Sequence, residues 1–365
     1  MLQRYRKLTC RCQACLILTK IKVGRTCLLF DMFQIITALR STRQLRSVPF
    51  RCRGISQCHA ATNEIPVVER EFHELQIPIP YGHLAAKQWL PMCVEDPHQR
   101  VLLLHGFQDN AGSFDPLVPR LDPRWHAVAL DFTGHGLSSH LPKGAPYFSM
   151  QFLLDISRAA NHLGWSQFSI IGHSMGGGAA LNYACIFPER VQNLVLIDVF
   201  APWYEQPSKV SQTIRAVLEG NMQLEQKDLS RPPVYTEEEV IKLYRHSIVP
   251  GYLPDNIRTL MKRGCKPVGD GRYILTRDIR LKYIQWIRAD RAALKEYYRG
   301  YTNNLLVVMA VPGIGGLSAN HKIVSDICAQ NCRTFQIVEV EGNHHVHMTH
   351  PDAVASHIRR FVNPH

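Results

Sequence analysis

The residue whose type and surroundings best fit a chemical role is a serine in a glycine-rich motif. Gly172-His173-Ser174-Met175-Gly176 follows the apolar run Phe168 to Ile171 and precedes a helix-like segment. In such a strand-turn-helix unit a sharp turn presents the serine hydroxyl, and glycines let strand and helix approach closely. Ser174 is therefore the expected nucleophile. A phosphate-binding loop is disfavoured because no Gly-Lys-Ser/Thr ending follows the glycines.

A serine hydroxyl needs a base to remove its proton, and three histidines near the end of the chain are candidates. They lie in Glu341-Gly342-Asn343-His344-His345-Val346-His347, after an apolar run and before a final helix. His344 directly follows the Gly-Asn turn and is the expected general base. His345 and His347 are interpreted as loop or packing residues. A His-x-His metal pair is the alternative, but no carboxylate cluster stands out as its partner. We expect no metal ion and no cofactor.

An aspartate should orient this histidine, and the expected chain order is serine, acid, histidine. Residues 311–325, the usual position for the acid, contain no Asp or Glu. The strand after the serine motif ends Leu194-Val195-Leu196-Ile197-Asp198, which places a carboxylate at the same sheet edge. A carboxylate there needs a partner, and a histidine N–H is suitable. Asp198 is the expected acid, with a capping role as its alternative. Asp131 is the next candidate, within a turn expected to line the active site.

The oxyanion of an acyl-transfer reaction needs donors that are already aimed at it. Leu104-His105-Gly106-Phe107 ends an apolar run, and a His-Gly turn there can direct the next N–H toward the serine. The expected donors are the backbone N–H groups of Phe107 and Met175. His105 is expected to be a structural, hydrogen-bonded residue of that turn.

The elements that must position these residues follow an α/β pattern from Glu64 onward. A hairpin is expected at 75–79 and 84–90, and six apolar strands at 101–104, 125–130, 168–171, 194–197, 305–310 and 335–340. Runs that are apolar on both faces are typical of a parallel sheet covered on both sides. Helices are expected at 149–162, 175–187, 318–330 and from Pro351. Residues 199–303 are too long for a loop and predict an inserted helical cap.

The net charge of +12, from 42 basic and 30 acidic residues, is concentrated in a leader. Residues 1–62 hold twelve basic residues and one acid, and residues 63–365 hold 30 basic and 29 acidic ones. The body, residues 63–365, is therefore nearly neutral, which removes the charge as a reason to expect nucleic-acid binding. An apolar content of 45% excludes a wholly disordered or collagen-like chain.

The leader carries five arginines and no acid from Met32 to Ala61, as in a mitochondrial presequence. The alternatives are a disordered basic tail of a cytoplasmic protein and translation that starts at Met32. Its apolar stretch at 26–39 is shorter than the roughly 18 residues of a membrane span, so no transmembrane segment is expected. Cys10, Cys12 and Cys15 have no second cluster that would complete a zinc site.

At these motifs the sequence resembles the serine hydrolase-like (kraken-like) proteins of the α/β-hydrolase superfamily. The resembling stretches are His105 to Asp115, Asp131 to Ser139, Ile170 to Gly177 and Gly342 to Met348, and the resemblance spans about residues 66 to 365. It implies an eight-stranded, mostly parallel sheet with a helical cap and a cofactor-free mechanism of Ser174 and His344. It also implies that some capped relatives carry the acid after the strand that follows the nucleophile, which fits Asp198. Related epoxide hydrolases and haloalkane dehalogenases differ because their nucleophile is an aspartate.

We therefore expect a serine hydrolase that cleaves an ester or related acyl bond of a small to medium, partly apolar substrate. The alternatives are an acyltransferase that uses the same triad and a binding or scaffold protein on a hydrolase fold. The expected partner is a small-molecule acyl substrate and not a nucleic acid, no transmembrane segment is expected, and the oligomeric state stays open. Aromatic residues of the cap are candidates to line an apolar pocket, although packing is their commoner role: Trp203, Tyr204, Tyr235, Tyr244 and Trp286.

Overall fold

The computed structural model describes residues 67–92, 99–200, 207–247, 251–285, 291–314 and 319–363. The leader at 1–62, with its targeting expectation and its cysteines, lies outside these ranges, as do Trp203, Tyr204 and Trp286. Within the described ranges, every helix is too short or too polar to cross a lipid bilayer.

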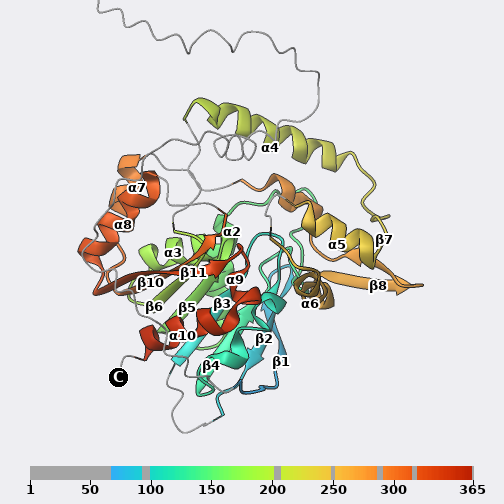
Figure 1. The fold of residues 1–365 in the computed structure, drawn as a ribbon. Helices are drawn as coiled ribbons and strands as arrows, with labels where there is room; N and C mark the ends of the chain where they lie inside the picture. Colours follow the sequence, from blue (N-terminus) through green and yellow to red (C-terminus); the bar gives the residue numbers. More distant parts are fainter. Residues whose placement is uncertain are drawn as a thin grey trace, which may run out of the picture. The chain divides into compact units, whose positions relative to one another are not determined.

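Eight strands form one sheet in the order β1-β2-β4-β3-β5-β6-β10-β11 (Figure 1). β2 pairs antiparallel with β1 and with β4, and all other neighbours are parallel. The predicted hairpin and the six predicted apolar strands all lie in this sheet, which confirms the predicted fold class. The strands are His73–Ile79 (β1), Gly82–Trp89 (β2), Gln99–Leu104 (β3), Trp125–Leu130 (β4), Phe168–His173 (β5), Val191–Ile197 (β6), Asn304–Pro312 (β10) and Thr334–Gly342 (β11).

The sheet separates two hydrophobic clusters, because successive side chains of a strand point to opposite faces. In β3, Leu102 and Leu104 belong to one cluster and Val101 and Leu103 to the other, and all four are buried. Helices cover both faces, as the continuous apolar runs require. The first cluster includes residues of α2 (Met150–His162), α3 (Met175–Ile186) and α8 (Ala319–Asn331), and the second includes residues of η1 (Ala111–Phe114), η2 (Val118–Arg120), α9 (Val346–Thr349) and α10 (Pro351–Val362).

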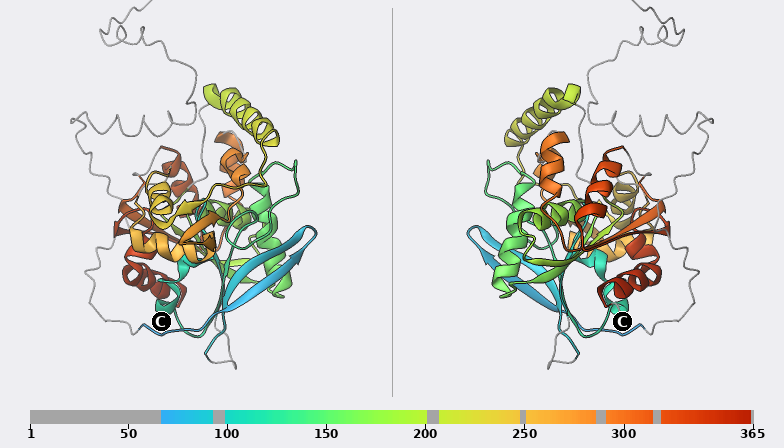
Figure 2. Two further views of the ribbon diagram at one scale, coloured as in Figure 1. Left: turned by 90° about the vertical axis from the view of Figure 1, so that its right-hand side faces the viewer. Right: turned by 90° about the vertical axis from the view of Figure 1, so that its left-hand side faces the viewer.

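The segment between β6 and β10 contains helices and a small second sheet (Figures 1 and 2). The second sheet has the order β7-β9-β8, where a segment of helices alone was expected. β8 is mostly exposed and contains Pro267, so no apolar alternation marks it in the sequence. The elements are η3 (Pro207–Lys209), α4 (Val210–Glu225), β7 (Tyr235–Thr236), α5 (Glu237–Arg245), α6 (Pro254–Gly264), β8 (Cys265–Gly269), β9 (Arg272–Leu275), η4 (Ile279–Tyr283) and α7 (Arg291–Tyr298).

Of the aromatic residues considered for a pocket, Tyr244 is a packing residue. Its ring lies 5.3 Å from that of Tyr252 in a T-shaped pair, within a third hydrophobic cluster. The cluster also includes Met348, which follows the predicted general base by four positions. This part of the insertion is therefore packed against the segment that carries His344.

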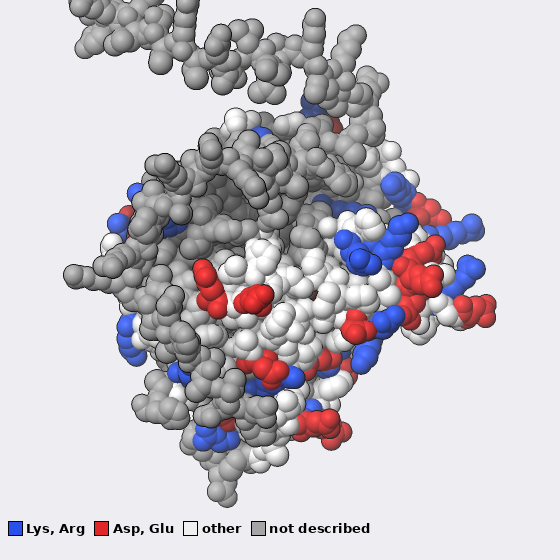
Figure 3. Space-filling view, in the orientation of Figure 1, with Lys and Arg blue, Asp and Glu red and all other residues white. Residues whose placement is uncertain are grey.

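Charged side chains of both signs lie intermixed on the face shown in Figure 3, over the side where α5 and β8 lie. Arg258 of α6 pairs with Glu237 of α5 at 2.7 Å and with Asp255 of its own helix at 3.0 Å. The first turn of α5 carries three glutamates and its last turn carries Lys242 and Arg245, in the order that the helix dipole favours.

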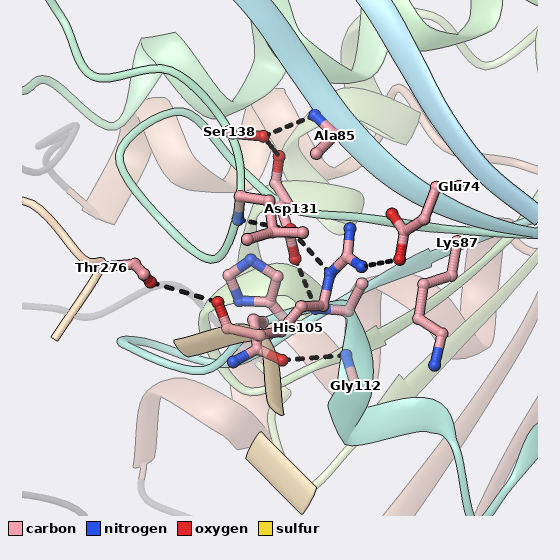
Figure 4. A network of polar contacts seen from close by, with 12 residues as sticks. Glu74, Ala85, Lys87, His105, Gly112, Asp131, Ser138 and Thr276 are labelled. Atoms are coloured by element: carbon pink, nitrogen blue, oxygen red, sulfur yellow. Dashed lines mark hydrogen bonds and ion pairs between the residues drawn. The ribbon is translucent and has the colours of Figure 1, made fainter. Parts of the chain in front are cut away.

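Buried charges connect the inserted segment to the sheet (Figure 4). Arg263, at the end of α6, donates from Nε to Asp131 Oδ2 at 2.9 Å and from Nη1 to Glu74. Asp131 also accepts the N–H groups of Ala111, at 2.7 Å, and Leu137, at 2.8 Å. Its carboxylate thus holds together the turns after β3 and β4 and the end of α6.

Replacing Arg263 with methionine is expected to destabilise the protein by about 3–5 kcal/mol, because it leaves the Asp131 carboxylate buried without its counter-charge. The side chain of Arg263 is 6% exposed and that of Asp131 is fully buried. Denaturant unfolding measures the effect. Arg258→Met is the matched control, because its ion pairs are exposed and their loss should leave the unfolding midpoint nearly unchanged. Equal unfolding midpoints for the two variants would contradict a stabilising role of the buried Arg263–Asp131 pair.

Candidate active site

Ser174 occupies a strained turn between β5 and α3. Its backbone has φ 50° and ψ −117°, a region that a residue with a side chain rarely adopts. The Ser174 N–H donates to the Ile197 carbonyl at 3.1 Å, which fixes the turn to the end of β6. The serine therefore lies where the predicted nucleophile was expected, at the carboxyl end of a central parallel strand.

Three glycines allow the backbone to pack closely around this turn. A Cβ on Gly176 would lie 2.2 Å from the Leu104 carbonyl oxygen, and one on Gly172 would lie 2.6 Å from Gly177 Cα. A Cβ on Gly177 would lie 2.4 Å from Val199 Cγ1. Gly178 differs, because a Cβ there would meet nothing within 4 Å.

This contrast gives a matched pair of variants. Gly176→Ala is expected to cost about 1–3 kcal/mol of stability or more, because its methyl group collides with backbone that cannot rotate away. Gly178→Ala should instead stabilise the protein by about 0.5–1 kcal/mol, because alanine is the better helix former at an open helical position. Thermal or denaturant unfolding distinguishes the two, and a Gly176→Ala variant as stable as the wild type would show that the turn has more room than described.

Asp198 and His344 form a direct buried pair. His344 Nδ1 lies 2.6 Å from Asp198 Oδ2, and both side chains are almost fully buried, at 1% and 2% exposure. Since a carboxylate accepts, Nδ1–H is the donor and Nε2 is left with a lone pair. His344 Nε2 makes no hydrogen bond within the described part of the chain. The histidine is thus held in the tautomer that a general base requires.

The turn after β10, which lacks an acidic residue, supports the acid of the neighbouring strand instead. The N–H of Ala310 donates to Asp198 Oδ1 at 3.0 Å, and the N–H of Ile314 donates to Oδ2 at 3.2 Å. A Cβ on Gly313 would lie 2.7 Å from Asp198 Oδ1, so glycine keeps space for the carboxylate. This segment has no carboxylate of its own, and it instead supplies backbone N–H donors to the Asp198 carboxylate.

Burial sets the protonation tendencies of the pair. Burial, together with the nearby His345, holds the pKa of His344 well below the usual 6.5, so the ring is neutral at neutral pH. Burial also raises the pKa of Asp198, and the N–H groups of Ala310 and Ile314 oppose that rise. A neutral imidazole beside an anchored carboxyl group suits proton abstraction.

The segment of His344 is connected to the serine turn through His173. His173 Nε2 donates to the His344 carbonyl oxygen at 2.9 Å, and the two rings lie 4.5 Å apart between centroids. His173 pairs with Ile197 in the sheet, so Ser174 and Asp198 directly follow neighbouring positions on β5 and β6. The structure thus brings Ser174, Asp198 and His344 to one edge of the sheet.

The predicted oxyanion donors come from two segments in contact. Met175 is the first residue of α3, and the first N–H groups of a helix have no partners within it. The position of a Gly176 Cβ lies 2.6 Å from the His105 carbonyl oxygen, so the first turn of α3 packs on the turn that holds Phe107. A helix N-terminus is a favourable place for a negative charge.

Two other candidates have different roles. His105 is buried, accepts the Phe132 N–H at 3.1 Å through Nε2 and donates to the Gly106 carbonyl at 2.8 Å, as expected of a structural residue. Asp131 is engaged with Arg263 and with backbone N–H groups rather than with His344. Its contacts favour Asp198 over Asp131 as the partner of the histidine.

Three residues near the site were not singled out from the sequence: Asp109, His173 and Tyr252. Tyr252 donates to Asp109 Oδ1 at 2.6 Å, and Asp109 Oδ2 lies 3.4 Å from His345 Nε2. His345 therefore has a carboxylate neighbour that the sequence alone did not reveal. The positions of two of these residues in the sequence could have indicated them, because Asp109 follows the end of β3 and His173 lies inside the serine motif.

The sheet order, the serine turn and the Asp-His pair at the carboxyl ends of the strands define an α/β hydrolase. Residues 99–232 match the family model described as alpha/beta hydrolase fold. A serine hydrolase-like protein of Danio rerio is 34% identical over 310 residues, covering 81% of this chain and 90% of that protein. The chain therefore belongs to the serine hydrolase-like proteins, as its motifs suggested.

Solved structures agree with the fold. A hypothetical protein of Pseudomonas aeruginosa PAO1 is similar with a TM-score of 0.66 and 30% identity, covering 79% of this chain and 97% of that chain. A carboxylesterase of Bacillus subtilis has a TM-score of 0.52 at 14% identity, covering 80% of this chain and 92% of that one, which is a likeness of fold.

Proposed function

We propose that this protein is a serine hydrolase of the carboxylesterase type that cleaves an ester or related acyl bond of a small to medium, partly apolar substrate. The observation that carries the proposal is the buried hydrogen bond of 2.6 Å between Asp198 and His344 at the sheet edge where Ser174 is held. Nucleophile, acid and base follow one another in the chain in the order typical of this fold.

In the first half of the proposed reaction, Ser174 Oγ attacks the substrate carbonyl carbon while its proton passes to His344 Nε2. The resulting oxyanion accepts hydrogen bonds from the N–H groups of Phe107 and Met175. Asp198 stabilises the His344 cation through Nδ1–H. Collapse of the tetrahedral intermediate breaks the bond to the leaving alcohol, which takes the proton from Nε2 and leaves an acyl group on Ser174.

In the second half, water attacks the acyl-enzyme and His344 accepts the proton of the water. The new tetrahedral intermediate collapses, the carboxylic acid is released, and the proton returns to Ser174 Oγ. Competing alcohols or thiols test the related acyltransferase activity: accumulation of a new ester or thioester, rather than the free acid, would favour the acyltransferase.

Labelling with a fluorophosphonate probe tests the nucleophile directly, because the probe phosphonylates an activated serine. Wild-type protein is expected to be labelled, and Ser174→Ala and His344→Ala proteins should not be. Circular dichroism of the variants controls for folding. A wild-type protein that resists the probe, or labelling that persists in Ser174→Ala, would instead favour a binding or scaffold protein.

The pH dependence of turnover reports the proposed base. Protonated His344 cannot accept the serine proton, so kcat/KM should fall as the pH falls through the pKa of this residue. Because burial holds the pKa of His344 below 6.5, that acid limb should lie below pH 6.5, with a level rate from there to about pH 7.5. A pH-rate profile with a neutral ester measures it. An acid limb above pH 6.5 would assign the titration to another group.

A further inference from the structure

Four buried histidines lie together beside the candidate active site, and two of them, His173 and His345, lie beside the buried carboxylate of Asp109. The ring of His173 lies 4.2 Å from that of His347, 4.5 Å from that of His344 and 5.0 Å from that of His345. All four histidines and Asp109 are at most 1% exposed. The proposed acyl-transfer reaction uses His344, and it gives Asp109, His173 and His345 no chemical role.

The protonation of His173 is determined by its hydrogen bond. A carbonyl oxygen only accepts, so the bond of 2.9 Å to the His344 carbonyl places the proton on His173 Nε2. With that proton on Nε2, Nδ1 of the imidazole carries a lone pair. That lone pair lies 3.8 Å from Asp109 Oδ2. Two acceptors thus approach each other. His173 Nδ1 has no hydrogen-bond partner within the described part of the chain, and the ring nitrogen beside Asp109 Oδ2 is His345 Nε2.

His345 brings a third ligand atom to the same oxygen. His345 Nε2 lies 3.4 Å from Asp109 Oδ2, while Asp109 Oδ1 is occupied by the Tyr252 hydroxyl at 2.6 Å. The carboxylate oxygen and the two ring nitrogens all lie within 4.8 Å of one another. Gly106 leaves room beside them, since a Cβ there would lie 2.7 Å from His173 Nδ1 and 3.0 Å from Asp109 Oδ2.

We propose that Asp109 Oδ2, His173 Nδ1 and His345 Nε2 bind a divalent transition-metal ion of the Zn²⁺ class. Two imidazole nitrogens and one carboxylate oxygen are a common Zn²⁺ set, whereas Ca²⁺ and Mg²⁺ prefer oxygen ligands. Bonds of about 2.0–2.2 Å in a tetrahedron place ligand atoms roughly 3.3–3.6 Å apart. The separations of 3.4 and 3.8 Å lie near this range, and the two ring nitrogens, which lie within 4.8 Å of each other, move together to the same spacing when the ion binds. The Tyr252 hydroxyl orients the carboxylate from the second shell.

The bound ion should inhibit acyl transfer, a consequence that rests on the proposed function. His344 must become a cation in the transition state, and its ring lies 4.5 Å from that of one ligand and 5.2 Å from that of the other. A divalent metal ion held by those ligands repels the imidazolium of His344 and so raises the energy of the transition state. The ion thus acts as an inhibitor that takes no part in bond making or bond breaking.

Metal binding is measured on the full chain by equilibrium dialysis against ZnCl₂ and elemental analysis. The background carries Cys10→Ser, Cys12→Ser and Cys15→Ser, so that this closely spaced group of leader thiols does not contribute. Asp109→Asn and His345→Gln should each weaken Zn²⁺ binding by at least about 100-fold. Tyr252→Phe should weaken it by about 10–100-fold. His347→Gln is the matched control, because it removes a buried histidine of the same cluster that lies outside the ligand set, and it should bind Zn²⁺ normally.

The visible absorption of bound Co²⁺ reports the coordination of the metal site independently. It is measured on the protein that carries only the three cysteine substitutions. Co²⁺ should give the intense visible bands of a four- or five-coordinate site, and these bands should vanish when Zn²⁺ is added. Zn²⁺ should also slow ester turnover, and a chelator should restore it. If Asp109→Asn fails to fold, the Zn²⁺ affinity of His345→Gln tests the metal site in its place.

Unchanged Zn²⁺ affinity in folded Asp109→Asn or His345→Gln protein would overturn the proposal, as would featureless six-coordinate Co²⁺ spectra. An inactive protein that still binds Zn²⁺ through these residues would count against the proposed function and not against the metal site.

Discussion

Ser174→Ala is expected to lower kcat for hydrolysis of an ester by about 10⁴- to 10⁶-fold, because it removes the hydroxyl that is proposed to form the acyl-enzyme. The hydroxyl is held at a strained position with φ 50°, at the end of the strand next to Asp198. Alanine fits the same backbone, and the fold should be retained. Steady-state kinetics with a chromogenic ester, together with the thermal midpoint, measures both effects.

Ser113→Ala is the matched control for this variant. Ser113 is also buried, and its hydroxyl makes no hydrogen bond within the described part of the chain. Its loss should leave turnover close to normal. If Ser174→Ala retained more than about one hundredth of the wild-type rate, the hydrolysis would not proceed through this serine.

His344→Ala should show the same order of loss, and the double variant should be little worse than either single variant. Residues that act as one unit give non-additive effects, because removing either of them disables the same step. Additive losses would indicate that Ser174 and His344 act in separate steps. Kinetics of the two single variants and the double variant completes this cycle.

The sequence was sufficient for the sheet and for the pair at its edge, because each signal was local. Ser174 lies in a motif that defines its own turn, and His344 follows a Gly-Asn turn. Asp198 required one further step, the inference that parallel strands end at the same edge, and the hydrogen bond of 2.6 Å between the two residues agrees with that inference.

The cluster around Asp109 was not predictable in the same way. Asp109 follows β3, His173 ends β5 and Tyr252 precedes α6, so their contacts depend on tertiary packing of distant segments. The small sheet of the insertion was also missed, because β7 has two residues and β8 is mostly exposed. Hydrophobic periodicity needs longer half-buried strands to be detected.

Asp198→Asn is expected to lower kcat by about 10³- to 10⁴-fold while the fold is retained. The Asp198 carboxylate accepts from Ala310 N–H at 3.0 Å and from Ile314 N–H at 3.2 Å, and an amide oxygen can retain one of these bonds. The amide NH₂ group then faces His344 Nδ1 and donates to it. This fixes the proton of the ring on Nε2, so that Nε2 can no longer accept the proton of Ser174.

Asp131→Asn is the informative comparison, because Asp131 is the other candidate acid. Its carboxylate pairs with Arg263 at 2.9 Å, so its loss should lower stability more than turnover per folded molecule. Kinetics normalised to the folded fraction separates the two effects. Near-normal turnover in Asp198→Asn would remove Asp198 from the triad, and a large loss of kcat in Asp131→Asn would transfer the acid role to Asp131. The expected pattern is the opposite one, because the Asp198 carboxylate touches the histidine ring and the Asp131 carboxylate is engaged by Arg263.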